Sequence, residues 1–286
     1  MANPVIIVTG ANGQLGTCVK DLAGNYPMFS FHFFSREEFP IDQPEIIQSV
    51  FSNLKPQFCI NCAAYTAVDL AESNREDCFR INAEAIGHLA SACSRSGCRL
   101  IHISTDYVFN GKSDVPYKET DKTDPVNFYG TTKENGEQMA FEKAPDSIVI
   151  RTSWVYSRYG KNFVKTMLHL MDTRKEINVV KDQTGSPTYA GDLAEAILKI
   201  VANGARHPGI YHYSNKGQIS WYEFALAIRE IAGKQCNIHP IPSSAYPTPA
   251  QRPHYSLLDT GKIESTYHIK IPDWHSSLEK CMKTLV

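Results

Sequence analysis

Short hydrophobic runs alternate with amphipathic stretches along the first half of the chain. Each run is too short for a helix and is rich in β-branched or aromatic residues, so each predicts a buried strand. Between the runs, apolar residues recur at helical spacing and predict helices. The first begins in the turn after the first strand and continues through Leu22, and the others cover 44–54, 69–92 and 128–143. The predicted strands cover 5–9, 29–34, 58–62, 99–104 and 147–152.

This alternation predicts an α/β fold: a Rossmann-type, doubly wound parallel sheet with right-handed crossovers. We expect a dinucleotide-binding domain over 1–160. The pattern is less regular afterwards, and we interpret 161–286 as mainly a smaller C-terminal substrate-binding lobe, with some segments returning to the main domain. The elements predicted there are helices at 162–173, 190–202, 221–232 and 275–285, strands at 177–180 and near Tyr211, and a proline-rich loop at 240–253.

The composition is that of an ordinary globular protein, with 42% hydrophobic and 21% charged residues in 286. A net charge of −1 provides no field that would attract nucleic acid or an anionic membrane. No apolar run approaches the roughly 20 residues that cross a bilayer, and the chain enters its first strand without a basic and apolar leader. We therefore expect a cytoplasmic protein without nucleic-acid or membrane partners.

The sequence contains eight cysteines, including the pair Cys59-x-x-Cys62. Such a pair is found in redox motifs and zinc sites. Here it lies at a predicted strand, where residues three apart point to opposite faces, and no second pair completes a metal site. We interpret these residues as small, buried, reduced thiols.

The turn after the first strand is spaced Gly10-x-x-Gly13-x-x-Gly16 and leads into a helix. Glycines there let the backbone approach a pyrophosphate, at which the helix N-terminus directs free N–H groups. By itself the turn is weak evidence, and a strand, turn and helix without a ligand remains the alternative. The cofactor-binding residues predicted in this turn are Gly10, Asn12, Gly13, Gln14 and Leu15.

Two further segments complete the predicted cofactor site. Ser35 and Arg36 follow the second strand, where an acidic residue often binds the ribose of NAD and a basic residue accommodates a 2′-phosphate. Arg36 therefore favours NADPH over NADH, the alternative being a solvated turn residue. Asp42 is within reach of the adenine edge. At the end of the third strand, small residues leave room for a ligand that lies across the sheet. We predict that Ala63, Ala64 and Tyr65 bind the cofactor there.

The candidate chemistry lies at Tyr129 and Lys133, which are four residues apart and share one face of a helix. A nearby cation favours phenolate and lowers the pKa of a tyrosine, so that the phenol can donate a proton to a carbonyl oxygen as a hydride arrives. Ser104 and Thr105 end the fourth strand, at the edge of the same predicted cleft, and a hydroxyl there can hydrogen-bond the carbonyl. Together with the glycine turn, these groups indicate carbonyl reduction by hydride transfer.

In these motifs the chain resembles the extended short-chain dehydrogenase/reductase superfamily and, within it, the dTDP-4-dehydrorhamnose reductase family. Matching segments run in order along nearly the whole chain, and the last three are more restrictive than the general reductase motifs. They are GANGQLG (10–16), NCAAYTAVD (61–69), STDYVF (104–109), YGTTK (129–133), RTSWVY (151–156), DQTGSPT (182–188) and AYPTPAQRP (245–253).

The resemblance implies reduction of the 4-keto group of dTDP-4-dehydro-6-deoxy-L-mannose to dTDP-L-rhamnose with NADPH or NADH. It implies that Tyr129 is the general acid, Lys133 its electrostatic partner and Thr105 the hydroxyl beside the carbonyl. Asp106 and Trp154 would shape the sugar pocket, although Trp154 is also typical of core packing. Arg252 would bind the diphosphate, because a guanidinium fork suits phosphate oxygens. The alternative for Arg252 is a surface loop charge.

Some members of the family bind Mg²⁺ at a dimer interface through acidic side chains. Here Thr17 and Cys18 follow the glycine turn, and Gly191 stands near the second acidic position. We therefore predict no metal site and leave a homodimer open. Two other functions also stay open. One is a reductase or epimerase of another nucleotide sugar, and the other is a non-catalytic NADP-binding regulatory subunit, like the β subunit of methionine adenosyltransferase.

Overall fold

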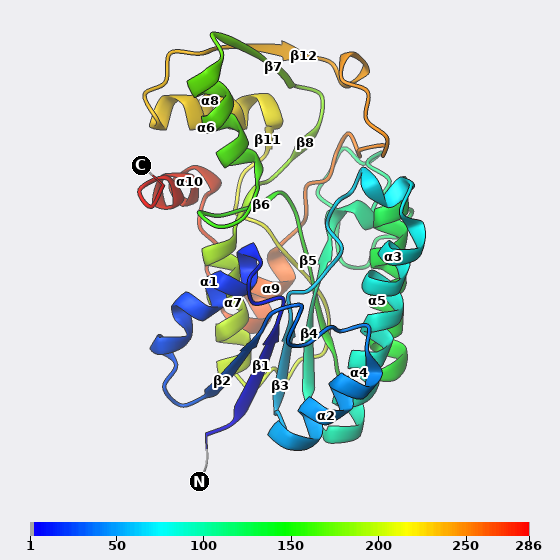
Figure 1. Cartoon of the computed structure of the whole chain (residues 1–286). Helices are drawn as coiled ribbons and strands as arrows, with labels where there is room; N and C mark the ends of the chain where they lie inside the picture. Colours follow the sequence, from blue (N-terminus) through cyan, green and yellow to red (C-terminus); the bar gives the residue numbers. More distant parts are fainter. Residues whose placement is uncertain (1–2, 286) are drawn as a thin grey trace.

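A six-stranded parallel sheet organises the protein (Figure 1), whose computed structural model describes residues 3–285. The strands pair in the order β2-β1-β3-β4-β5-β10. Their bounds are β1 (Val5–Thr9), β2 (Ser30–Phe34), β3 (Phe58–Asn61), β4 (Arg99–Thr105), β5 (Ile148–Thr152) and β10 (Gly209–Tyr213). The strand order reverses beside β1, which opens a crevice at the carboxyl ends of the strands. The predicted fold class is confirmed.

Alternate residues along each strand face two separate hydrophobic cores. On β1, Ile6 and Val8 belong to one core and Ile7 to the other, and all three are fully buried. Helices cover both faces of the sheet (Figure 1). The first face carries α1 (Gln14–Leu22), α7 (Ala190–Ala202) and α9 (Gly261–Tyr267), and the second carries α2 (Pro44–Leu54), α4 (Ala85–Ser96) and α5 (Phe128–Lys143).

The stretch predicted as one helix over 69–92 is built from several pieces. They are η2 (Leu70–Glu72), α3 (Arg75–Phe79), a π-helical turn η3 (Arg80–Glu84) and α4. The Asn82 side chain in the π turn donates to the Tyr65 carbonyl at 3.0 Å and accepts from the Tyr65 N–H at 2.9 Å. The helix α5 then packs so closely that a Cβ at Gly136 would collide with the Asn82 carbonyl oxygen. Gly136 weakens the helix but permits this approach.

A smaller lobe lies above the carboxyl ends of the strands (Figure 1) and has its own hydrophobic core. It contains three helices and a two-stranded parallel sheet, with short strand pairs at its base. The helices are α6 (Phe163–Thr173), α8 (Trp221–Ile231) and α10 (Trp274–Met282). The strand pairs are β7 (Glu176–Val180) with β12 (Asn237–Ile241), β8 (Thr184–Gly185) with β11 (Ile219–Ser220), and β6 (Val155–Tyr156) with β9 (Thr188–Tyr189).

Two features of the second half differ from the sequence prediction. The loop expected over 240–253 begins later, because Pro240 lies inside β12. A two-stranded sheet leaves each strand a free edge, where proline removes no ladder hydrogen bond. The helix α9 was not predicted. It packs beside β10 on the face of the sheet that α1 and α7 also cover. Three 3-10 turns complete the fold: η1 (Ala23–Asn25), η4 (Asp106–Val108) and η5 (Ser243–Ala245).

Across the described range 3–285, none of the helices combines the length and the apolar character that a membrane crossing requires.

Candidate active site

A cleft of about 880 Å³ lies where the carboxyl ends of the sheet strands meet α5 and the lobe. Its volume is in the range that holds cofactors and small substrates. The cleft brings together every predicted site residue except Arg252. Those that line it are Gly10, Asn12, Gly13, Gln14, Leu15, Arg36, Asp42, Ala63, Ala64, Tyr65, Thr105, Asp106, Tyr129, Lys133 and Trp154.

The glycine turn forms one end of the cleft. Gly10 has a φ of 63°, and a Cβ at this position would lie 2.7 Å from the Ala63 backbone nitrogen. Gly13 precedes α1 as its N-cap and provides no side-chain cap, so the first N–H groups of the helix are available to an anion. The turn therefore has the geometry of a phosphate-binding loop.

The Gln14 side chain connects this turn to the lobe. Its Oε1 accepts from Ser157 Oγ at 3.0 Å and from Asn162 Nδ2 at 2.9 Å. Asn162 also caps α6, since its Oδ1 accepts from the Lys165 N–H. Beside this connection the exposed side chain of Lys161 lines the cleft, a cation that sequence reasoning missed.

Arg36 and Asp42 line the cleft beyond β2, but within residues 3–285 only Asp42 is engaged in an ion pair with another side chain. The Arg36 side chain is exposed, which leaves its guanidinium accessible to a phosphate. Asp42 forms an ion pair with Arg80 from the π turn, and Arg80 also contacts Asp77. The Asp42 carboxylate is thus already engaged at the place where we predicted an adenine contact.

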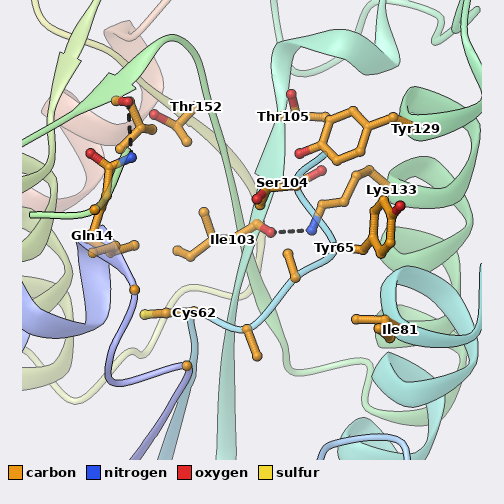
Figure 2. Close-up of a pocket in the computed structure, with 18 of the residues that line it drawn as sticks. Gln14, Cys62, Tyr65, Ile81, Ile103, Ser104, Thr105, Tyr129, Lys133 and Thr152 are labelled. Carbon is orange, nitrogen blue, oxygen red and sulfur yellow. Dashed lines mark hydrogen bonds between the residues drawn. The ribbon is translucent and has the colours of Figure 1, made fainter. Parts of the chain in front are cut away.

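Tyr129 lies in the first turn of α5, where the Asn127 cap accepts from the Gly130 N–H at 2.8 Å. Figure 2 shows its phenol beside Thr105. Burial raises the pKa of Tyr129 above its usual value, with further contributions from Asp106 and Tyr107, while a hydrogen bond to Thr105 opposes them. This differs from the expected lowering by Lys133. The phenol is therefore protonated at neutral pH, which is the form that a proton donor requires.

The Lys133 amine is directed at β4 rather than at the phenol (Figure 2). Its Nζ donates to the Ile103 carbonyl at 2.7 Å and lies 3.3 Å from His102 Nε2. Burial lowers the pKa of Lys133 to about 8, although the negative charge of Glu137 raises it. The amine is protonated at pH 7, yet it is far easier to deprotonate than an exposed lysine.

A buried ion pair holds the end of β4 in place. Glu137, one turn after Lys133, accepts from Arg151 Nε at 2.8 Å and Arg151 Nη2 at 2.6 Å, and from Ser104 Oγ at 2.5 Å. All three side chains are at most 5% exposed. Sequence reasoning assigned Ser104 to the cleft edge but missed Glu137 and Arg151. These two residues support the strand end that carries Thr105.

Asp106 is buried where the cleft meets η4. Its Oδ1 accepts from Thr105 Oγ1 at 3.0 Å, and its Oδ2 has no hydrogen-bond partner. Burial raises the pKa of this carboxyl to about 6. Asp106 lines the cleft, and a buried carboxylate oxygen without a partner is suited to accept from a ligand hydroxyl.

Trp154 lines the lobe side of the cleft with a left-handed backbone, at φ 48°. Its indole stacks on Trp221 with ring centroids 3.7 Å apart and planes at 13°. A Cβ at Gly185 would come within 2.9 Å of the Trp154 ring, so backbone also packs closely against the indole. Trp221 was missed, and its one sequence signal is its position at the start of a helix after Ser220.

Arg252 does not line the cleft. Its guanidinium forms a bidentate salt bridge with the Asp69 carboxylate, in which Nη2 donates to Oδ2 at 2.8 Å. The guanidinium also donates to the Ala250 carbonyl at 2.6 Å. This pair holds the pKa of Asp69 below its usual value. The proposed contact with a diphosphate stays a prediction.

The sequence of residues 4–286 matches the family described as RmlD substrate binding domain. A dTDP-4-dehydrorhamnose reductase from Sinorhizobium fredii is 40% identical over 290 residues, which cover 98% of this chain and 97% of the relative. One from Burkholderia thailandensis is 40% identical over 297 residues, which cover 98% and 99%. A solved dTDP-4-dehydrorhamnose reductase from Bacillus anthracis, in complex with NADP, has a TM-score of 0.95 at 38% identity and covers 99% of both chains.

The chain belongs to the dTDP-4-dehydrorhamnose reductase family. The resemblance seen in the sequence motifs is thereby confirmed over nearly the full length.

The cysteine pair of this reductase does not form a redox site. Cys59 is fully buried, whereas Cys62 is partly exposed at the cleft, and both are free. Burial raises the pKa of both thiols, which suppresses their reactive thiolate form. Residues 3–285 contain no group of three or more His, Cys, Asp or Glu side chains placed to hold a metal ion.

Proposed function

We propose that this chain reduces the 4-keto group of dTDP-4-dehydro-6-deoxy-L-mannose to give dTDP-L-rhamnose, with NADPH as the preferred reductant and NADH as an alternative. The observation that carries the proposal is the convergence of Thr105, Tyr129 and Lys133 in one cleft with the glycine turn. The names of the curated relatives and the NADP in the Bacillus anthracis structure support the substrate and the cofactor.

The cleft fits a dinucleotide. The uncapped start of α1 suits the pyrophosphate, and the accessible guanidinium of Arg36 suits a 2′-phosphate. The bound cofactor supplies a hydride to the carbonyl carbon. Lys133, whose Nζ donates to the Ile103 carbonyl on β4, would hydrogen-bond the cofactor's ribose and orient its reactive face.

The protein supplies the proton. Tyr129 carries it on a phenol of raised pKa, and it passes the proton to the substrate oxygen as negative charge develops there. Thr105 positions that oxygen, although its own hydroxyl proton is donated to Asp106 in this structure and must turn toward the substrate. The positive charge of Lys133 then stabilises the phenolate that remains.

The lobe would bind the sugar nucleotide. Trp154, backed by Trp221, forms the wall of the sugar pocket, and Asp106 Oδ2 accepts from a sugar hydroxyl. Lys161 and Arg252 are the two candidate cations for the diphosphate. We further propose that the protein works in the cytoplasm, where its eight free thiols would stay reduced. We also propose that any homodimer of this chain holds no metal ion at its interface.

The test is turnover with product identification. The purified protein is incubated with NADPH and a panel of 4-keto sugar nucleotides, including the 4-keto rhamnose precursor generated in situ. We expect NADPH oxidation with that precursor and dTDP-L-rhamnose as the product. Turnover of another sugar nucleotide instead would favour the related reductases and epimerases. Tight NADPH binding without any turnover would favour the regulatory subunit.

A further inference from the structure

A chain of buried polar groups crosses the sheet beneath the cleft and ends at the Lys133 amine. Thr9 on β1 donates to Asn61 Oδ1 at 2.5 Å, and Asn61 Nδ2 lies 3.0 Å from His102 Nδ1. His102 Nε2 in turn lies 3.3 Å from Lys133 Nζ. Thr9, Asn61 and His102 are fully buried and Lys133 is 2% exposed, so water cannot exchange these contacts.

The chain determines which nitrogen of His102 carries the proton. Asn61 Oδ1 accepts from two donors, Thr9 Oγ1 and the Ala63 backbone N–H at 3.3 Å. Because a backbone N–H can only donate, the amide oxygen must face Ala63 and the amide NH₂ must face His102. His102 Nδ1 then accepts, and in the neutral ring the proton sits on Nε2.

Burial keeps the His102 ring neutral, since it lowers the pKa of the imidazole well below its usual value. An N–H of His102 therefore points at Lys133 Nζ. Such a group stabilises the neutral amine, which can accept a hydrogen bond, and opposes the ammonium, which cannot. The Ile103 carbonyl, also on β4, has the opposite effect because it accepts from the ammonium.

We propose that His102 is a positioning residue of the reductase: it presents Nε2–H to Lys133 and so favours the neutral amine, which makes the ammonium release its proton more readily. The other titratable groups that face Lys133 are Glu137 from its own helix and Cys78 from α3. The inference rests on the proposed function, in which Tyr129 loses a proton in each turnover and Lys133, one helical turn away, replaces it.

The tautomer can be measured without turnover. Nitrogen NMR of protein labelled with ¹⁵N-histidine, with His102 assigned by its loss in His102→Asn, should show a neutral ring with Nε2 protonated and Nδ1 unprotonated. A ring protonated on Nδ1, or a charged ring at pH 7, would overturn the inference. The measurement uses the protein alone, so its failure is distinct from a failure of the reductase proposal.

The pH profile tests the consequence. In His102→Asn the amide occupies the position of Nδ1 and keeps a partner for Asn61, but it leaves nothing that donates to Lys133. In the plot of kcat against pH, we expect the fall at alkaline pH (the alkaline limb) to move up by about one pH unit. His102→Gln, whose amide reaches the position of Nε2 and can offer its oxygen to the ammonium, should move the limb in the same direction.

His212→Gln is the matched control, because His212 is equally buried on β10 but contacts the Tyr117 carbonyl instead of Lys133. It should lower the melting temperature and leave the alkaline limb in place. If both His102 variants stay folded and the limb is unchanged, or moves to lower pH, His102 does not act on the amine in the proposed way.

Discussion

The two walls of the cleft are built by different means. The wall at the ends of β1 and β3 consists of consecutive residues, the glycine turn and the segment 63–65, and it presents mainly backbone and small side chains. The opposite wall presents Asp106 from η4, Trp154 from the segment between β5 and β6, and Trp221 from α8 of the lobe. Its working groups are side chains, and they are held by contacts between segments that are distant in the sequence, as when Trp154 stacks on Trp221.

This difference follows from what each wall would bind. A dinucleotide phosphate is recognised by N–H groups and a helix end, which one local segment provides. A particular sugar is recognised by side chains whose buried polar atoms match its hydroxyls, which requires several segments to meet. Four predictions, taken in order of expected effect, test whether one wall binds the cofactor and the other binds the sugar nucleotide.

The largest effect is expected between the walls, at Tyr129. Tyr129→Phe removes the proton donor and should lower kcat by about 10²- to 10⁴-fold, while the Kd for NADPH stays nearly unchanged. Single-turnover kinetics and fluorescence titration measure the two quantities. Tyr107→Phe is the control, because that ring packs edge-on against Tyr129 in the same cleft but has no lysine one turn away. Near-normal turnover of Tyr129→Phe would remove the phenol from the chemistry.

On the cofactor wall, Arg36→Ala should weaken NADPH by about tenfold, the effect of losing one charge-assisted hydrogen bond. The affinity for NADH should change little, since NADH lacks the 2′-phosphate. Isothermal titration with both cofactors provides the measurement, and Arg36→Lys should retain part of the preference. Equal losses for the two cofactors would make Arg36 a solvated turn residue.

On the substrate wall, two charge removals compare Lys161 with Arg252. If a cation binds the diphosphate, its replacement by alanine should raise the KM for the sugar nucleotide by about fivefold and affect the KM for the cofactor less. We expect this of Arg252→Ala. Steady-state kinetics with each substrate varied gives the answer. If Lys161→Ala alone raises this KM, the pair of Arg252 with Asp69 only anchors its loop.

The smallest effect at neutral pH is expected for Asp106→Asn. Because the pKa of Asp106 is raised to about 6, the carboxylate is ionised at pH 7 and protonates as the pH falls through 6, so the wild type should lose substrate affinity on the acid side. The variant should have no acid limb at that pH. A raised pKa also means that the ionised carboxyl opposes folding above pH 6, so the variant should melt no lower than the wild type at pH 7. If the variant still loses substrate affinity as the pH falls through 6, a group other than Asp106 causes that loss.

Much of the fold could be predicted because its signals are local. The buried strands of the sheet, the glycine turn and the helix that carries Tyr129 and Lys133 each depend on hydrophobic period and residue type within a short window. The helix α9 and the strand β12 were not predicted, because short elements with weak patterns depend on packing against distant segments. Pro240 in β12 illustrates this, since only the free edge of a two-stranded sheet makes proline acceptable there.

The sequence by itself determined the fold class, the glycine turn and the candidate catalytic pair, because spacing along one strand or helix places those groups on a common face. Only the tertiary structure decided how the groups behave. Burial raises the pKa of Tyr129 and lowers that of Lys133, Asp69 pairs with Arg252, and Trp221 stacks behind Trp154. Desolvation and pairing depend on neighbours that are remote in the chain, and a local pattern contains no information about them.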